Sequence, residues 1–201
     1  MRLISTLLAL ALLLAPYALA NGTKIDVTDL PNHPVMTELP QNTHLRIYLR
    51  SGDIEIRARE DNKLAVRYDG PAADRFKDLS VHFERSSDSG TLELRGGPDR
   101  NMRVVIELPR VSSLFVRMSA GNLEVGRFSG DQDISLRAGE LNIAMGDPKE
   151  YARIHASVLT GGLEAPPLGE DHGGLFRSFT KDGPGQFRLT AHVTAGDLTL
   201  H

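Results

Sequence analysis

Few residues of this 201-residue chain are arranged as a reactive site would need them. The absence of cysteine excludes thiol catalysis and thiolate metal ligation. The seven histidines are scattered, and His155 and His192 occupy polar positions of alternating segments, which is typical of solvated strand residues. The chain has no G-x-S-x-G elbow, phosphate-binding loop, dinucleotide fingerprint or H-E-x-x-H pair. We therefore predict no catalytic, cofactor-binding or metal-binding residue, no cofactor and no enzymatic activity.

Two acidic segments are candidate cation sites. Glu170-Asp171-His172 stands in a Gly-rich segment that we interpret as a loop, and two carboxylates with an imidazole can ligate a metal. Adjacent loop residues rarely all turn toward one ion, so a solvated loop tip is the favoured interpretation. Asp131 and Asp133 resemble the alternating acids of calcium-binding repeats. The full glycine-aspartate run does not recur, however, and aspartates that stabilise a turn explain them.

Arginines are numerous at the outward positions of alternating segments. They include Arg46, Arg57, Arg95, Arg103, Arg117, Arg137 and Arg188. A guanidinium binds carboxylates and phosphates through a fork of donors, so one interpretation is a surface for an anionic glycan or a lipid phosphate. We favour cross-strand ion pairing, because the arginines are interspersed with acids and the net charge is −3. That charge gives no basic footprint for nucleic acid.

Aromatic residues give no signal for a sugar platform. The chain has no tryptophan, and Phe176 and Phe179 form the only close aromatic pair in a segment that resembles a loop. We predict core or corner positions for both.

A repeated six-residue motif predicts the elements that would position these side chains. In order, it consists of a small residue, a glycine, a polar residue, an apolar residue, a second polar residue and a second apolar residue. Its copies begin at Ser51, Ser89, Ala120, Ala138, Thr160 and Ala195. Glycine adopts positive φ without a side-chain penalty, and the alternation after it sends Leu or Ile to one face. We therefore expect each copy to be a turn followed by a short strand.

The spacing of the copies predicts a stack of strands. Apolar residues recur about every 20–25 residues in two series, a repeat length typical of stacked β units. The series are Leu123, Leu141, Leu163 and Phe187, and Ile134, Ile154, Phe176 and Leu198. The predicted inward rows are Leu123, Val125, Leu141, Ile143, Leu163 and Ala165 on one side, and Ile134, Leu136, Ile154, Ala156 and Leu198 on the other. The fold class is thus all-β, a single-domain, repeat-built β-solenoid-like stack over residues 43–201.

The N-terminal half leaves its arrangement open. Strands are expected at 24–28, 45–49, 54–58, 64–68, 79–84, 91–95, 102–108 and 114–118, with one helical turn at 72–77. The Ser51-Gly52 junction is either a hairpin turn or a corner of the stack. Residues 43–112 either continue the solenoid or form an antiparallel layer.

The N-terminus carries an export signal. Arg2, the apolar run Leu3–Leu14, Pro16 and the A-x-A site at Ala18–Ala20 predict a signal peptide over residues 1–20. The apolar run is shorter than a membrane-spanning helix needs. We therefore expect a protein of the periplasm or the secreted fraction that is not transmembrane after cleavage. A Pro-rich lead-in over residues 21–42 precedes the repeats and lies over the body of the fold.

Together with Leu108-Pro109 running into Leu114–Val125, the repeated motif resembles the bacterial putative-adhesin family, also called toast-rack domains. The resemblance covers residues 43–201 and implies an exported, repeat-built envelope protein without established enzymatic activity or catalytic residues to transfer.

We predict recognition of an envelope protein, a glycan or a lipid headgroup. The alternative is a glycan-active enzyme on a β-helix scaffold, for which stacked polar residues such as Glu124, Asn142 and Glu164 would have to converge. A third possibility is self-association by strand addition at an open end of the solenoid near Leu198 to His201.

Overall fold

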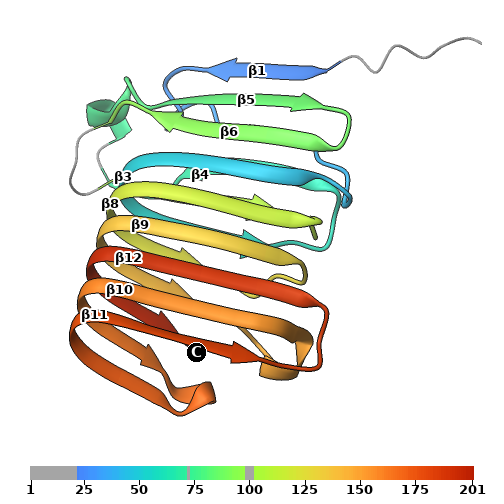
Figure 1. Cartoon of the computed structure of the whole chain (residues 1–201). Coiled ribbons are helices and arrows are strands. Elements are labelled where there is room, and N and C mark those ends of the chain that lie inside the picture. The colour runs from blue at the N-terminus through green and yellow to red at the C-terminus, as the bar shows by residue number, and fades with distance from the viewer. Residues whose placement is uncertain (1–21, 72, 98–101) are drawn as a thin grey trace, which may run out of the picture.

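The computed structural model describes residues 22–71, 73–97 and 102–201, and this part of the chain is all-β. One large mixed, largely parallel sheet contains twelve strands (Figure 1). The predicted signal peptide and its cleavage site after Ala20 lie outside the described residues. Within the described residues, no helix is long and apolar enough to cross a membrane.

Five long strands form the centre of the sheet. In spatial order they are β3 (His44–Ala58), β8 (Ser113–Val125), β9 (Asp131–Ile143), β12 (Phe187–Leu200) and β10 (Tyr151–Ala165). All four neighbouring pairs are parallel, with the motif copies in register. Each of these strands is bent (Figure 1), and the glycine of its motif is the residue within it that has a positive φ. We call this position the corner, the residues before it the first arm and those after it the second arm. The Ser51-Gly52 junction is thus a corner inside one continuous strand, and the hairpin alternative is wrong.

Close backbone contact explains the glycine at each corner. Gly52, Gly121, Gly139, Gly161 and Gly196 all have φ between +112° and +136°. A Cβ on Gly139 would lie 1.9 Å from the carbonyl oxygen of Gly121, far inside the closest approach of real atoms. A side chain at the corner would therefore meet the backbone of the adjacent strand.

The core lies between the two arms. On the second arm, Leu123, Leu141, Leu198 and Leu163 form one row, all fully buried. A row on the first arm consists of Ile47, Val116, Ile134, Ala191 and Ala156, again fully buried. Burying a Leu or Ile side chain contributes about 1.5–3 kcal/mol, so these rows are the main stabilising contacts.

The inward residues predicted from the repeats are buried, but the assignment of Leu198 to a side is wrong. Leu198 lies on the second arm, level with Leu141, and not on the side of Ile134. Ile154 and Ala156 lie on the first arm with Ile134, as predicted, and the residue level with Ile134 is Ala156. The reason is that each bent strand supplies inward residues to both arms. A regular step along the sequence therefore does not stay on one arm.

The C-terminal strand is inserted into the sheet. β12 pairs with β9 on one side and β10 on the other, and Leu198 and Leu200 are fully buried. β11 (Glu170–Asp182) runs antiparallel to β10. The following strand, β12, therefore runs in the direction of β10 again, and it lies between β9 and β10. The prediction of an open end at Leu198 to His201 is therefore wrong, and the edge strand is β11.

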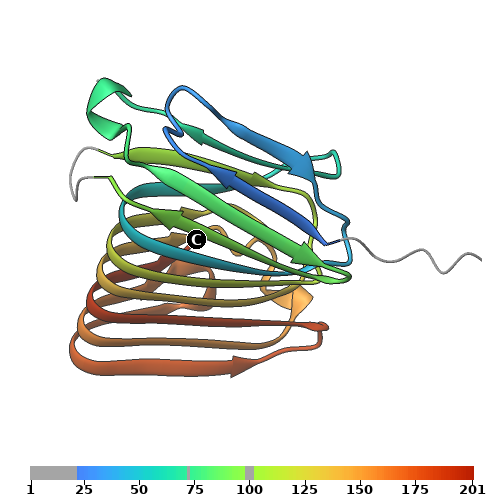
Figure 2. The same cartoon turned by 90° about the horizontal axis from the view of Figure 1, so that it is seen from above.

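The sheet forks beyond β3. The first arm of β3 pairs with β6 (Ser89–Arg95), and its second arm pairs with β7 (Arg103–Leu108). Antiparallel strands continue each branch, namely β5 (Ser80–Ser86) and β1 (Thr23–Val27) beyond β6, and β4 (Lys63–Tyr68) and β2 (Val35–Glu38) beyond β7 (Figure 2). The antiparallel alternative thus describes these outer strands.

Several smaller predictions fall in this region. The motif copy at Ser89 lies inside β6 and makes no corner. The expected helical turn is the short 3₁₀ helix η1 (Ala73–Phe76); two others are η2 (Pro148–Glu150) and η3 (Pro166–Leu168). β1 is an edge strand as expected, and Leu30 and Leu39 of the lead-in are fully buried, so the lead-in contributes to the core.

Candidate ligand-binding face

The corner sorts the outward charges by sign. Outward positions shift by one residue there, so each strand presents a separate set on each arm. On the first arms of the five long strands these positions carry Arg46, Arg50, Arg117, Arg137, Arg153 and Arg188, with Asp131 and Asp133. On the second arms, the outward positions carry Asp53, Glu55, Glu124, Glu140, Glu164 and Asp197, with one base, Arg57, which is ion-paired to Glu55. Charges that alternate along the sequence are therefore separated in space.

An aromatic pair lies on the basic face formed by the first arms. Tyr48 of β3 and Phe115 of β8 meet edge to face, with ring centroids 6.1 Å apart. The Arg117 guanidinium lies over the Phe115 ring, 3.6 Å from its centroid, and donates to Asp133 Oδ2 at 3.0 Å. The ion pair and the cation–π contact hold Arg117 in place, so the ring and the guanidinium form a fixed platform.

Two shallow grooves lie on this face. The first, of about 370 Å³, is lined by outward residues that include His44, Arg46, Phe115, Asp131 and Arg188. The second, of about 360 Å³, is lined by Tyr48, Arg50, Glu93, Arg95 and Arg117, among others. Phe115 borders one groove and Tyr48 the other, so the aromatic pair separates them. Each groove therefore combines an aromatic edge with guanidinium groups and with carboxylates, which are Asp131 and Asp133 in the first groove and Glu93 in the second.

Some arginines of this face keep their charge available. Of the arginines singled out in the sequence, Arg57, Arg95, Arg103 and Arg117 form ion pairs with neighbouring acids, as the favoured interpretation expects. Arg46, Arg137 and Arg188 are exposed, and their side chains form no ion pair with any described residue. Arg46 and Arg188 both line the first groove, where Asp131 accepts the backbone N–H of Arg188 at 2.9 Å. These two guanidinium groups of the first groove thus have no ion-pair partner among the described residues.

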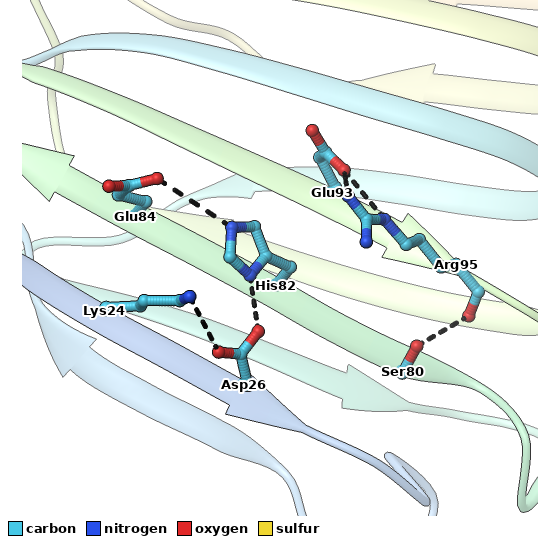
Figure 3. Close-up of polar contacts among 7 residues, drawn as sticks. All are labelled: Lys24, Asp26, Ser80, His82, Glu84, Glu93 and Arg95. Atoms are coloured by element: carbon cyan, nitrogen blue, oxygen red, sulfur yellow. Dashed lines mark hydrogen bonds and ion pairs between the residues drawn. The ribbon is translucent and has the colours of Figure 1, made fainter.

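Toward the N-terminal edge, the same face is occupied by paired charges (Figure 3). Asp26 accepts a hydrogen bond from His82 and lies 3.6 Å from Lys24. The bond from His82 holds the pKa of the Asp26 carboxyl below its ordinary value of 3.8. Arg95 forms an ion pair with Glu93. Because the charges at this end satisfy one another, the basic groove lies between β3 and β12.

The residues weighed as metal ligands do not converge. Glu170 and Asp171 belong to strand β11 and not to a loop; they pair with Ala165 and Glu164 respectively, so their side chains leave on opposite faces. Asp131 and Asp133 point outward from β9, and Asp133 is bound to Arg117. The side chain of His172 lies outside the described part of the structure, and among the side chains that are described, no three His, Cys, Asp or Glu are grouped to hold a metal ion.

The arrangement contains one serine–histidine pair that resembles part of a catalytic triad. Ser157 Oγ lies 2.9 Å from His192 Nδ1, while His192 Nε2 lies 3.3 Å from the Thr194 hydroxyl. A nucleophilic serine needs a histidine whose second nitrogen is oriented by an acid, and here a hydroxyl takes that place. His155 similarly bonds Thr180 at 2.9 Å. Both histidines are strand residues in hydrogen-bond networks.

The polar row proposed for a glycan-active enzyme forms only in part. Glu124 is level with Asn142, but Thr199 separates Asn142 from Glu164. The row lies on the acidic second arms, opposite in charge to the groove.

The aromatic pair was missed in the sequence, although a signal for it exists. Aligning the copies at Ser51-Gly52 and Ala120-Gly121 places Tyr48 level with Arg117 and Phe115 level with Arg46. Diagonal neighbours on one face of adjacent strands are within reach of aromatic side chains. Extending the alignment to the residues before each motif would therefore have predicted the contact.

Phe176 is 78% exposed. Of the core and corner positions predicted for it, the core position is therefore wrong.

Comparisons with known proteins give the following. The chain matches no family model and no curated protein. Among solved structures it is similar to a putative cell adhesion protein from Clostridium sporogenes ATCC 15579, with 14% identity, a TM-score of 0.48, and coverage of 89% of this chain and 98% of that one. It is also similar to a putative adhesin from Bacteroides fragilis NCTC 9343, with 8% identity, a TM-score of 0.31 and coverage of 84% and 96%. These TM-scores are too low to carry an argument about function.

Proposed function

We propose that this chain is an exported, non-enzymatic recognition protein of the bacterial envelope, a β-solenoid of the toast-rack type that binds an anionic glycan on its basic face. The observation that carries the proposal is the first groove, where Arg46 and Arg188 have no ion-pair partner among the described residues and Phe115 lines the same space. Guanidinium groups bind carboxylates through paired hydrogen bonds, and an aromatic ring offers a surface for a sugar ring. The predicted signal peptide supports a location in the periplasm or outside the cell.

The charge pattern supports an extended acidic ligand. The groove crosses β3, β8, β9 and β12, so a linear oligosaccharide could contact guanidinium groups on several strands. The acidic second arms would repel the same ligand, which restricts binding to the first-arm face. Among the described residues, the second ring nitrogen of His192 is bound by the Thr194 hydroxyl and not by a carboxylate, which favours binding over hydrolysis.

The test is calorimetric titration of the protein with a uronic-acid oligosaccharide and with a neutral oligosaccharide of equal length. We expect binding of the acidic sugar only, with an affinity that falls as salt rises. A charge-assisted hydrogen bond contributes about 1.5–3 kcal/mol, so Arg46→Ala with Arg188→Ala should weaken binding at least about tenfold.

The matched control is Arg103→Ala, which removes an exposed arginine that is ion-paired to Glu55 on the other arm. It should leave the affinity unchanged. Equal loss in Arg103→Ala would show a nonspecific charge effect. Binding to vesicles of anionic lipid without binding to the acidic sugar would replace the glycan with a lipid headgroup, and cleavage of the sugar would restore the enzymatic alternative.

A further inference from the structure

β11 leaves a long edge of the sheet uncovered. Within the described residues it pairs with β10 and with no other strand, and Figure 1 shows it at the lower end of the sheet. It has 13 residues, whereas β1 at the opposite end has five. An edge strand presents a row of unpaired backbone N–H and C=O groups, and proteins usually shorten, charge or cover such edges. A long, uncovered edge therefore indicates a partner strand.

Exposed apolar side chains gather at the corner of this strand. Leu175 is 59% exposed and Phe176 78%, and Leu159 on the adjacent β10 is 38% exposed. Phe176 has a φ of +54°, a conformation that is costly for a bulky residue. The strand thus presents its apolar side chains to solvent at its midpoint.

We propose that β11 pairs antiparallel with β11 of a second copy of this chain, about a twofold axis between Leu175 and Phe176. A bent strand matches its copy only if corner meets corner. A twofold axis through the corner achieves this, because it lays the first arm of one copy along the second arm of the other.

The alternation of side chains restricts the register. The Glu170 end of β11 pairs with the second arm of β10, and the Asp182 end pairs with the first arm. Outward side chains fall on odd-numbered residues at the Glu170 end and on even-numbered residues at the Asp182 end, because Asp171 is level with Glu164 and Ser178 with Ser157. Outward faces therefore meet only when odd-numbered residues lie opposite even-numbered ones.

Charge selects one register among those that remain. With corner on corner, Leu175 lies opposite Phe176 of the second copy, and Glu170 lies opposite Lys181. By symmetry each pair occurs twice, so apolar contacts form at the centre and opposite charges meet at both ends. A shift of two residues in one direction places Asp171 opposite Asp182, and a shift in the other direction separates Glu170 from Lys181.

The experiment is sedimentation velocity on the full chain purified from cells, over a wide range of protein concentration. We expect a monomer–dimer equilibrium. Leu175→Lys should raise the dissociation constant at least about tenfold. Its matched control is Met36→Lys, which changes an apolar side chain that is 62% exposed on β2. This control should leave the dimer intact, and both variants should melt as the unmodified protein does.

Charge reversal tests the register. Lys181→Glu should weaken the dimer, and combining it with Glu170→Lys should restore it, because the exchanged charges attract again. A chain without native cysteine also allows a disulfide test. A Leu175→Cys variant mixed with a Phe176→Cys variant should form a cross-linked heterodimer on oxidation. A monomer at every concentration, equal effects of Leu175→Lys and Met36→Lys, or a double charge variant weaker than Lys181→Glu would overturn the proposal.

Discussion

Substitution of Gly139 by alanine probes the row of corner glycines. Gly139 has a φ of +128°, a conformation that costs a residue with a side chain about 1–3 kcal/mol. The added Cβ would also lie 1.9 Å from the carbonyl oxygen of Gly121 and 2.8 Å from its carbonyl carbon. The clashing atoms are backbone, so no rotamer change relieves them.

The second cost comes from strand pairing. Moving β9 away from β8 at the corner loosens neighbouring ladder hydrogen bonds, each worth about 1 kcal/mol when buried. Together with the conformational cost, we expect Gly139→Ala to lower the free energy of unfolding by about 3–5 kcal/mol, which approaches the total stability of many domains. For a protein of this size each kcal/mol lowers Tm by about 2–4 °C.

Gly169→Ala is the matched control. Gly169 has a φ of +75° and ψ of 23°, and no heavy atom lies within 4 Å of the position that its Cβ would take. This variant therefore has the cost of the left-handed conformation alone, about 1–2 kcal/mol. Chemical denaturation of both variants, followed by circular dichroism, gives the comparison. If Gly139→Ala destabilised the protein no more than Gly169→Ala does, close approach of the strands would not be the reason for the glycine row.

Two further predictions concern the core. Burial raises the pKa of the Tyr151 phenol above its ordinary value of 10.0, so the contribution of the phenol to stability is complete below pH 10 and falls as the pH rises through the higher folded-state pKa. Denaturation over an alkaline pH series should show this decline. Tyr151→Phe should reduce the decline and should lower the free energy of unfolding by about 1–3 kcal/mol near neutral pH, because the phenol no longer donates to the Met145 carbonyl. Leu141→Ala should lower the free energy of unfolding by about 2–5 kcal/mol, since Leu141 is fully buried between Leu123 and Leu198. A loss below about 1 kcal/mol in urea denaturation would contradict the claim that this row of leucines is a main stabilising contact.

The sequence predicts which side chains face inward, although the expected turns with short strands are bends inside long continuous strands. Alternation after each glycine determines which side chains face inward, and Leu123, Leu141 and Leu163 are buried as expected. The order of strands is not encoded locally. Nothing in the motif at Ala195 distinguishes a strand at the edge from one between β9 and β10, because a parallel strand buried on one face has the same pattern at either position.

The basic face could not be predicted from the sequence, because its residues come together only through strand pairing and through the bend of each strand. Along the chain, arginines are interspersed with acids, and this mixing favours ion pairing. The corner changes which residues point outward, so in each strand the arginine before the glycine and the acid after it leave on different arms. Tyr48 and Phe115 are far apart in sequence and meet only through strand pairing. The mixing of positive and negative residues along the sequence therefore does not predict how the charges are distributed over the two arms of a bent sheet.

The insertion of β12 gives the C-terminal residues a structural role beyond closing the chain. β9 and β10 do not pair with each other; among the described strands, β10 pairs only with β11 and with β12, and β12 in turn pairs with β9. β10 and β11 are therefore attached to the rest of the sheet by the last strand of the chain. Since the proposed dimer edge is β11 and the basic groove reaches β12, the same strand connects the surface for a second copy to the face for a ligand. Because the proposed twofold axis lays the first arm of one copy along the second arm of the other, each basic face of the dimer would continue into an acidic face, so the two grooves would bind separate ligand segments and not one straight polymer.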